Sequence, residues 1–203
     1  MLKSNTVIDY GRIRNKIGSR TKFKKKKEMN YFAYGSNIAK ARILERINSA
    51  EFITRGYLLN HRLSFHKIGQ DGSAKCDAFE TGNMRDSVLG ALYRIAPAEK
   101  EQLDQVEGLG NGYDEKEVTI MADSGKRMTA LTYYATNIDT TLKPFHWYKD
   151  HVLIGAREQD FPKEYIEQYI SIESIDDPDA ERAERELGIH GPGKRDRFGR
   201  IVE

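Results

Sequence analysis

At 203 residues with 38% hydrophobic side chains, the chain can bury one substantial core and has the length of a single domain. No apolar run approaches the roughly 20 residues that cross a bilayer, and the N-terminus lacks the apolar core of a secretory signal. The single cysteine, Cys76, excludes an intramolecular disulfide and is expected to be a small buried residue. These features predict a soluble cytoplasmic protein with no membrane partner.

The net charge of +2 conceals an asymmetry along the chain. Residues 1–28 contain ten Lys or Arg and two acidic residues, so this segment carries +8 and the rest of the chain carries −6. It has little apolar periodicity and includes four consecutive lysines at 24–27, which predicts a disordered basic arm. A nucleic-acid partner for this arm is not favoured, because charge runs are commonly only solvated. The alternative is that residues 1–28 precede the true translation start at Met29.

The first folded elements are predicted on either side of a glycine. Residues 29–34 form a short apolar run typical of a buried strand, and apolar side chains at three-residue intervals predict a helix at 38–47. A strand that stops at Gly35 and restarts as a helix presents free backbone N–H groups, which suit an anion. The alternative is a plain turn in which Ser36 or Asn37 caps the helix.

The rest of the chain mixes strands and helices. Further strands are predicted at 57–65, 75–80, 86–95, 114–122 and 127–136, with Gly90 as a bulge or a point of close approach. Helices are predicted at 97–108, 144–158, 162–174 and 178–187, followed by a polar tail. Strands in runs, with helices between only some of them, favour an α+β domain over a doubly wound parallel sheet.

The titratable residues give one candidate of interest. The histidines at 61 and 66, and those at 146 and 151, are five residues apart, a poor spacing for ligands, so no metal site is predicted. Glu107 ends the helix predicted at 97–108, where the negative end of the helix dipole should raise its pKa above about 4.3. The alternative is a solvated glutamate at a helix end.

Three separated motifs carry a resemblance to a known family. "YFAYGSN" at 31–37, "LDQVEG" at 103–108 followed by Tyr113, and "PFHWYKDHVLIGAREQDFPKEYI" at 144–166 occur in the order found in the γ-glutamylcyclotransferase family. The resemblance covers about residues 29–174. It implies an α+β fold in which a small mixed β-sheet, partly closed into a barrel and flanked by helices, encloses a pocket. The expected domain is 29–175, with a charged C-terminal helix and tail at 176–203.

The resemblance also implies an activity and a set of site residues. Family members convert a γ-glutamyl amine into 5-oxoproline and a free amine, without a metal or an organic cofactor. By motif position Glu107 matches the catalytic acid/base, and the substrate-binding positions are Tyr31, Phe32, Ala33, Tyr34, Gly35, Ser36, Asn37, Tyr113 and Tyr148. The sequence departs from the family pattern at Phe145, Leu89 and Asp160-Phe161. These departures bear on which substrates are accepted more than on the chemistry.

Several alternatives stay open at this point. The substrate is either a γ-glutamyl amino acid, a γ-glutamylamine, or a carrier-bound γ-glutamyl intermediate of secondary metabolism. A non-catalytic module that binds a γ-glutamyl-like ligand is the alternative from another functional class. A homodimer is a further possible assembly.

Overall fold

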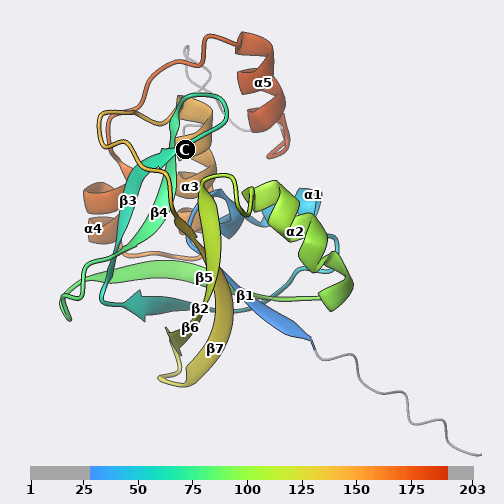
Figure 1. The fold of residues 1–203 in the computed structure, drawn as a ribbon, viewed down its shortest axis with the longest axis vertical. Coiled ribbons are helices and arrows are strands. Elements are labelled where there is room, and N and C mark those ends of the chain that lie inside the picture. Colours follow the sequence, from blue (N-terminus) through green and yellow to red (C-terminus); the bar gives the residue numbers. More distant parts are fainter. Residues whose placement is uncertain (1–27, 192–203) are drawn as a thin grey trace, which may run out of the picture.

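The computed structural model describes residues 28–191, so the basic arm up to residue 27 and the tail from residue 192 lie outside the described residues (Figure 1). The strands are β1 Met29–Ala33, β2 Glu51–Leu59, β3 His61–Ile68, β4 Ala74–Glu80, β5 Ser87–Ile95, β6 Tyr113–Ala122 and β7 Arg127–Ala135. The helices are α1 Lys40–Arg46, α2 Lys100–Glu107, α3 His146–Glu158, α4 Lys163–Tyr165 and α5 Ala180–Gly188. Short 3₁₀ turns cover Ser36–Ile38 and Pro97–Glu99.

Five strands close into a barrel in the order β1-β5-β2-β6-β7. Four of the neighbouring pairs are antiparallel, and the closing pair, β1 with β7, is parallel with Tyr31 opposite Leu131. Strands β3 and β4 form a separate two-stranded sheet beside the barrel, and helices flank both (Figure 1). The predicted α+β fold with a mixed barrel is therefore confirmed, and the barrel is fully closed.

One predicted strand was wrong. Residues 57–65 are not a single strand, because the chain leaves β2 and enters β3 at Asn60, which has a left-handed φ of 63°. On either side of this residue the strands pair with different partners, β5 and β6 before it and β4 after it. The close approach expected at Gly90 is confirmed, since a Cβ there would lie 2.4 Å from the Ala33 carbonyl oxygen.

Two predicted helices differ from the structure in their extent. The helix expected at 162–174 is limited to α4 and a π-helical stretch at Ile166–Ile170. The helix expected at 38–47 is split, because Ala39 is extended, with φ −66° and ψ 125°, between the first 3₁₀ turn and α1. Helix α3 packs against this break, since a Cβ on Gly155 would lie 2.3 Å from the Ala39 nitrogen. Glycine in α3 therefore allows the turn after β1 to be held closely.

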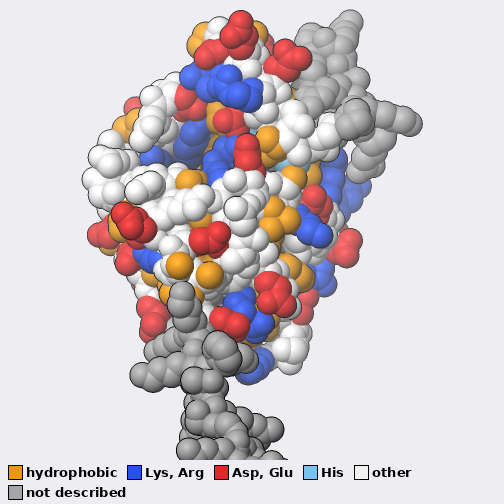
Figure 2. All heavy atoms as spheres, turned by 90° about the vertical axis from the view of Figure 1, so that its right-hand side faces the viewer, with side chains coloured by type: hydrophobic (Ala, Val, Ile, Leu, Met, Phe, Trp, Pro, Cys, Tyr) orange, Lys and Arg blue, Asp and Glu red, His pale blue; other side chains and the backbone are white. Residues whose placement is uncertain are grey.

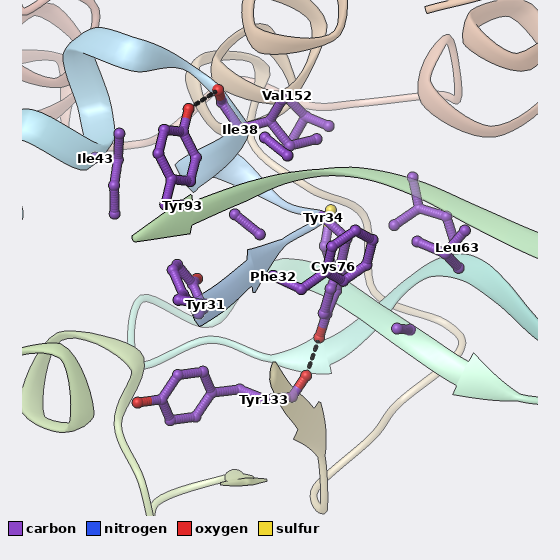
Figure 3. Packing of buried hydrophobic residues seen from close by; sticks show 14 of the residues in the cluster. Tyr31, Phe32, Tyr34, Ile38, Ile43, Leu63, Cys76, Tyr93, Tyr133 and Val152 are labelled. Carbon is purple, nitrogen blue, oxygen red and sulfur yellow. Dashed lines mark hydrogen bonds between the residues drawn. The ribbon is translucent and has the colours of Figure 1, made fainter. Parts of the chain in front are cut away.

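Strand β1 runs through the core and positions the turn that follows it (Figure 3). Successive side chains of a strand point to opposite faces, so Phe32 is fully buried in the core while Tyr31 lies toward Tyr133 (Figure 3). Two hydrogen bonds fix this region: Tyr34 donates to the Tyr133 carbonyl at 2.6 Å, and the hydroxyl of Tyr93 donates to the Ile38 carbonyl at 2.9 Å. The end of β1 is thus tied to β7, and the 3₁₀ turn that follows it is tied to β5.

Candidate active site

The carboxyl group of Glu107 lies where α2, β1 and the turn after β1 meet. The Tyr31 hydroxyl donates to Glu107 Oε1 at 2.9 Å, and the amide nitrogen of Asn37 donates to the same oxygen at 2.5 Å. Arg46 Nη1 donates to Asn37 Oδ1 at 2.9 Å, which orients the amide. Helix α2 ends at this glutamate because Gly108 adopts a left-handed φ of 75° and caps the helix. Residues 31–37 and helix α2, which are far apart in the sequence, therefore meet at one carboxylate.

The environment of Glu107 raises its pKa. Burial raises the pKa of this carboxyl above its ordinary value, and the opposing effects of the Arg46 charge and the Tyr31 hydrogen bond, joined by Arg42 and Lys67, do not cancel it. The direction predicted from the helix dipole is confirmed, but burial is the main cause. A carboxyl with a raised pKa can hold and release a proton closer to neutral pH than an ordinary glutamate.

The turn at Gly35 lies directly against β4. A Cβ at Gly35 would be 3.1 Å from the Cys76 Cβ and 3.3 Å from the Tyr148 hydroxyl oxygen. The Cys76 N–H donates to the Tyr148 hydroxyl at 3.0 Å, and the Tyr113 hydroxyl donates to the Cys76 carbonyl. Because φ of Gly35 is −107°, this close approach, and not a left-handed backbone, is what favours glycine.

Cys76 is the small buried residue that the sequence predicted. Its exposed fraction is 1%, and burial raises the pKa of its thiol. A thiol that stays protonated is a poor nucleophile. The contribution of Cys76 to the site is therefore its backbone, which fixes two tyrosine hydroxyls.

A recess of about 30 Å³ opens beside Glu107. It is lined by Tyr31, Tyr34, Gly35, Ser36, Asn37, Cys76, Glu107, Tyr113, Tyr133 and Tyr148. The structure thus brings together eight of the ten residues predicted for the site. The other two, Phe32 and Ala33, have exposed fractions of 0% and 1%, pack in the core and are not among the lining residues of either this recess or the cleft beside it.

A larger cleft of about 420 Å³ adjoins the recess, because Ser36, Glu107, Tyr113 and Tyr148 line both. Its remaining wall is strongly charged and combines cations with two further carboxylates, from Arg42, Arg46, Lys67, Lys75, Arg182, Asp71 and Glu186. Figure 2 shows Lys and Arg side chains gathered among acidic ones in the upper half of the face drawn there. A substrate can therefore place its reacting end in the recess and its other end in a charged cleft.

Three residues of these cavities carry no signal in the sequence. Tyr133 on β7 lines the recess, with its ring centroid 6.0 Å from that of Tyr31. Arg46 on α1 and Lys67 on β3 line the cleft. None of the three belongs to a motif. Tyr133 and Lys67 reach the cavities from β7 and β3, and Arg46 reaches the cleft from the end of the short helix that follows the turn after β1.

Within residues 28–191, no helix is long and apolar enough to cross a membrane. No group of three or more His, Cys, Asp or Glu side chains is placed there to hold a metal ion. Two of the histidines have other partners: His66 contacts Asp77 at 2.8 Å, and His151 contacts His190 at 2.6 Å.

A buried carboxyl group at the junction of a recess and a cleft is typical of an enzyme site for a small molecule. Comparison with known proteins agrees. The AIG2-like family matches residues 87–169. The γ-glutamylcyclotransferase of Bos taurus is 32% identical over 153 residues, covering 72% of this chain and 79% of the relative. The Homo sapiens γ-glutamylcyclotransferase is 31% identical over the same shares of the two chains.

The three-dimensional comparison gives the same result. A solved structure of a γ-glutamyl cyclotransferase superposes with a TM-score of 0.71 at 29% identity, covering 79% of this chain and 98% of that one. The chain therefore belongs to the γ-glutamylcyclotransferase family of enzymes, and the resemblance found in the sequence is confirmed.

Proposed function

We propose that this enzyme cleaves a small γ-glutamyl substrate, with Glu107 as its general acid and base, to give 5-oxoproline and a free amine or amino acid. The observation that carries the proposal is the position of the Glu107 carboxyl, held by Tyr31 and Asn37 at the junction of the recess and the cleft. The γ-glutamyl group is placed in and beside the recess, and the departing amine is placed in the cleft.

The substrate supplies its own nucleophile. Its α-amino nitrogen attacks the γ-carbonyl carbon and closes a five-membered ring, and the bond from that carbon to the departing nitrogen then breaks. Intramolecular attack reaches effective molarities of roughly 10⁵ to 10⁸ M when the geometry is right. The enzyme therefore has to hold the folded conformer and move one proton, and needs no nucleophilic serine or cysteine.

Glu107 moves that proton in this proposal. An α-ammonium with a pKa of about 8 must lose a proton before it attacks, and the departing nitrogen must gain one. Tyr31 and Asn37 both donate to Oε1, which leaves Oε2 of Glu107 for the exchange. The carboxylate takes the proton from the ammonium and delivers it to the leaving nitrogen.

The turn after β1 is assigned the developing oxyanion. Backbone N–H groups at the start of a helical turn have no partner within that turn, and Gly35, Ser36 and Asn37 occupy this position beside the recess. Tyr113 and Tyr148 border the same space and are assigned contacts with the substrate. The burial of Phe32 and Ala33 favours a packing role for them.

Mass-spectrometric detection of 5-oxoproline after incubation with a panel of γ-glutamyl amino acids and γ-glutamylamines tests the proposal. Release of 5-oxoproline with the matching amine supports it. Binding of these compounds without 5-oxoproline would instead support the non-catalytic binding module. The homodimer and the cytoplasmic location stay predictions, which light scattering and cell fractionation test.

A further inference from the structure

Asn37 lies between the guanidinium of Arg46 and the carboxyl of Glu107. Its Oδ1 accepts a hydrogen bond from Arg46 Nη1 at 2.9 Å, and its Nδ2 donates to Glu107 Oε1 at 2.5 Å and to the Tyr31 hydroxyl oxygen at 3.1 Å. The amide of an asparagine has one acceptor oxygen and two donor hydrogens. Each polar atom of this amide therefore has a partner, and the residue is only 3% exposed.

The guanidinium of Arg46 favours one orientation of this amide. If the amide were turned over, its oxygen would face Oε1 of Glu107 and its NH₂ group would face the guanidinium, so an acceptor would meet an acceptor and a donor would meet a donor. Such mismatches are costly in a buried site, because the polar atoms have no water to bind instead. Arg46 therefore turns the N–H groups of Asn37 toward the carboxyl and the Tyr31 hydroxyl.

The position of Arg46 is fixed by the two helices that meet at the site. Arg46 lies in the last turn of α1, and its carbonyl accepts from Gln102 Nε2 on α2 at 2.6 Å. Arg42, one turn earlier on α1, pairs instead with Glu186. Because α2 ends at Glu107, the guanidinium and the carboxyl belong to helices that are bonded to each other.

The charge of Arg46 also acts on Glu107. It is the largest of the effects that lower the pKa of this carboxyl against its burial. The hydrogen bond from Tyr31 and the charges of Arg42 and Lys67 have smaller effects. The other titratable side chains around the carboxyl stay uncharged near neutral pH, because burial raises the pKa of each: Tyr31, Tyr34, Cys76, Tyr113, Tyr133 and Tyr148.

We propose that Arg46 is a positioning residue of the reaction, whose guanidinium acts through the Asn37 amide to hold Oε1 of Glu107 and leave Oε2 for the proton. This inference rests on the proposed function, because it takes Glu107 to be the group that moves the proton. In this role Arg46 does not contact the reacting atoms. Its effect should therefore appear in kcat and in the pH dependence of the rate, and not in substrate binding.

Arg46→Met and Arg46→Lys test the inference. Methionine has neither the charge nor the donor, so kcat for 5-oxoproline release should fall by about 10- to 100-fold, the usual size of a hydrogen bond to a charged group, while KM changes little. The acidic limb of the pH–rate profile should move to higher pH, because Glu107 must lose its proton to act as a base and the cation that most lowers its pKa is gone. Arg46→Lys keeps a charge and a donor and should recover most of both.

A double-mutant cycle shows whether the effect on kcat passes through the amide. Asn37→Ala alone removes a donor to Glu107 and should lower kcat. If Arg46 acts through this amide, adding Arg46→Met should not lower kcat further, whereas independent effects would multiply. Lys40→Met is the control for a lost positive charge and should change neither kcat nor the pH profile, because Lys40 is exposed at the start of α1 and lines neither cavity.

A titration of the Glu107 carboxyl gives a second readout that needs no turnover. Carbon-13 NMR of protein labelled at the glutamate side-chain carboxyl carbon follows this group, and Glu107→Gln assigns its signal. The titration midpoint should be higher in Arg46→Met than in the parent. Thermal unfolding shows whether each variant is folded. If Arg46→Met does not fold, Arg46→Gln also removes the charge and should move the midpoint in the same direction.

The outcomes are distinguishable. A raised KM with an unchanged kcat would mean that Arg46 contacts the substrate, and a parental kcat and pH profile in a less stable protein would mean that it only supports α1. Either result, or a full further loss of kcat in the double mutant, refutes the positioning role while the cyclotransferase reaction stands. If the parent enzyme releases no 5-oxoproline from the panel of γ-glutamyl compounds, the proposed function fails. The NMR titration of Arg46→Met then still decides whether Arg46 acts on Glu107.

Discussion

Replacing Glu107 by Gln separates proton transfer from the other roles of this residue. The amide keeps the size of the side chain and an oxygen that can accept from Tyr31 and Asn37, but it cannot carry the proton. Removing a general acid–base group lowers the rate by roughly 10² to 10⁴, or about 3 to 5 kcal/mol in the barrier. We therefore expect kcat to fall at least about 100-fold while the substrate still binds.

The same substitution should not weaken the fold. Burial raises the pKa of Glu107 in the folded state, so the folded protein binds this proton more tightly than the unfolded chain does. The stability that this group contributes is fully present below the unfolded pKa of about 4.3, and it is lost as the pH rises through the folded value. At neutral pH the Gln variant should melt at the same temperature as the parent or above it. The difference in melting temperature between the variant and the parent should shrink as the pH falls toward 4.

The assay combines 5-oxoproline release, calorimetric binding and thermal unfolding at pH 7 and pH 4. Glu101→Gln is the matched control, because Glu101 is exposed in the first turn of the same helix and should leave turnover and binding unchanged. A Glu107→Gln protein that unfolds readily would indicate a structural carboxylate. One that cyclises the substrate at the parental rate would remove Glu107 from the catalytic role.

Three further predictions test the rest of the site and the start of the chain. Gly35→Val should abolish turnover and leave the protein folded, because the valine side chain would enter the space beside the recess. Normal turnover by this variant would support the plain capping turn. Gly188→Ala is the control, because the space at its Cβ is open. Tyr31→Phe removes a hydrogen bond that lowers the pKa of Glu107, so the acidic limb of the pH–rate profile should move to higher pH; an unchanged profile would contradict this pairing. A protein that starts at Met29 should have the same melting temperature and activity as the full chain. If the full chain binds RNA in a salt-dependent way and the shortened protein does not, the nucleic-acid alternative is supported.

Much of the fold could be predicted because its elements have strong local signals. The apolar run before Gly35 and the Pro97 to Gly108 segment are bounded by residues that fix a turn or a helix end. The strand expected at 57–65 was wrong because the break at Asn60 depends on a conformation that asparagine tolerates without requiring it. The alternating pattern continues across the break, so the sequence gives no sign that β2 and β3 belong to different sheets.

The site shows the same division between local and long-range information. Glu107 and the turn at Gly35 could be singled out because a carboxylate at a helix end and a glycine after a strand are unusual where they stand. The raised pKa of Glu107 was expected from its helix, yet it depends mainly on burial, which exists only when α2 meets β1. Pattern alone could give the direction of this shift and not its cause.

The charged cleft beside the recess is built mainly from residues that the sequence motifs do not include. The proposed proton transfer needs one carboxyl group and its two donors, and all three lie in motifs that also carry the family resemblance. The charged wall of the cleft comes from residues outside these motifs, and its lysines differ in their contacts: Lys75 pairs with Asp71 and donates to Ser73, whereas Lys67 lies over the ring of Tyr113. The motifs therefore predict where the proposed proton transfer takes place, and the charges that face the rest of the substrate follow only from the fold.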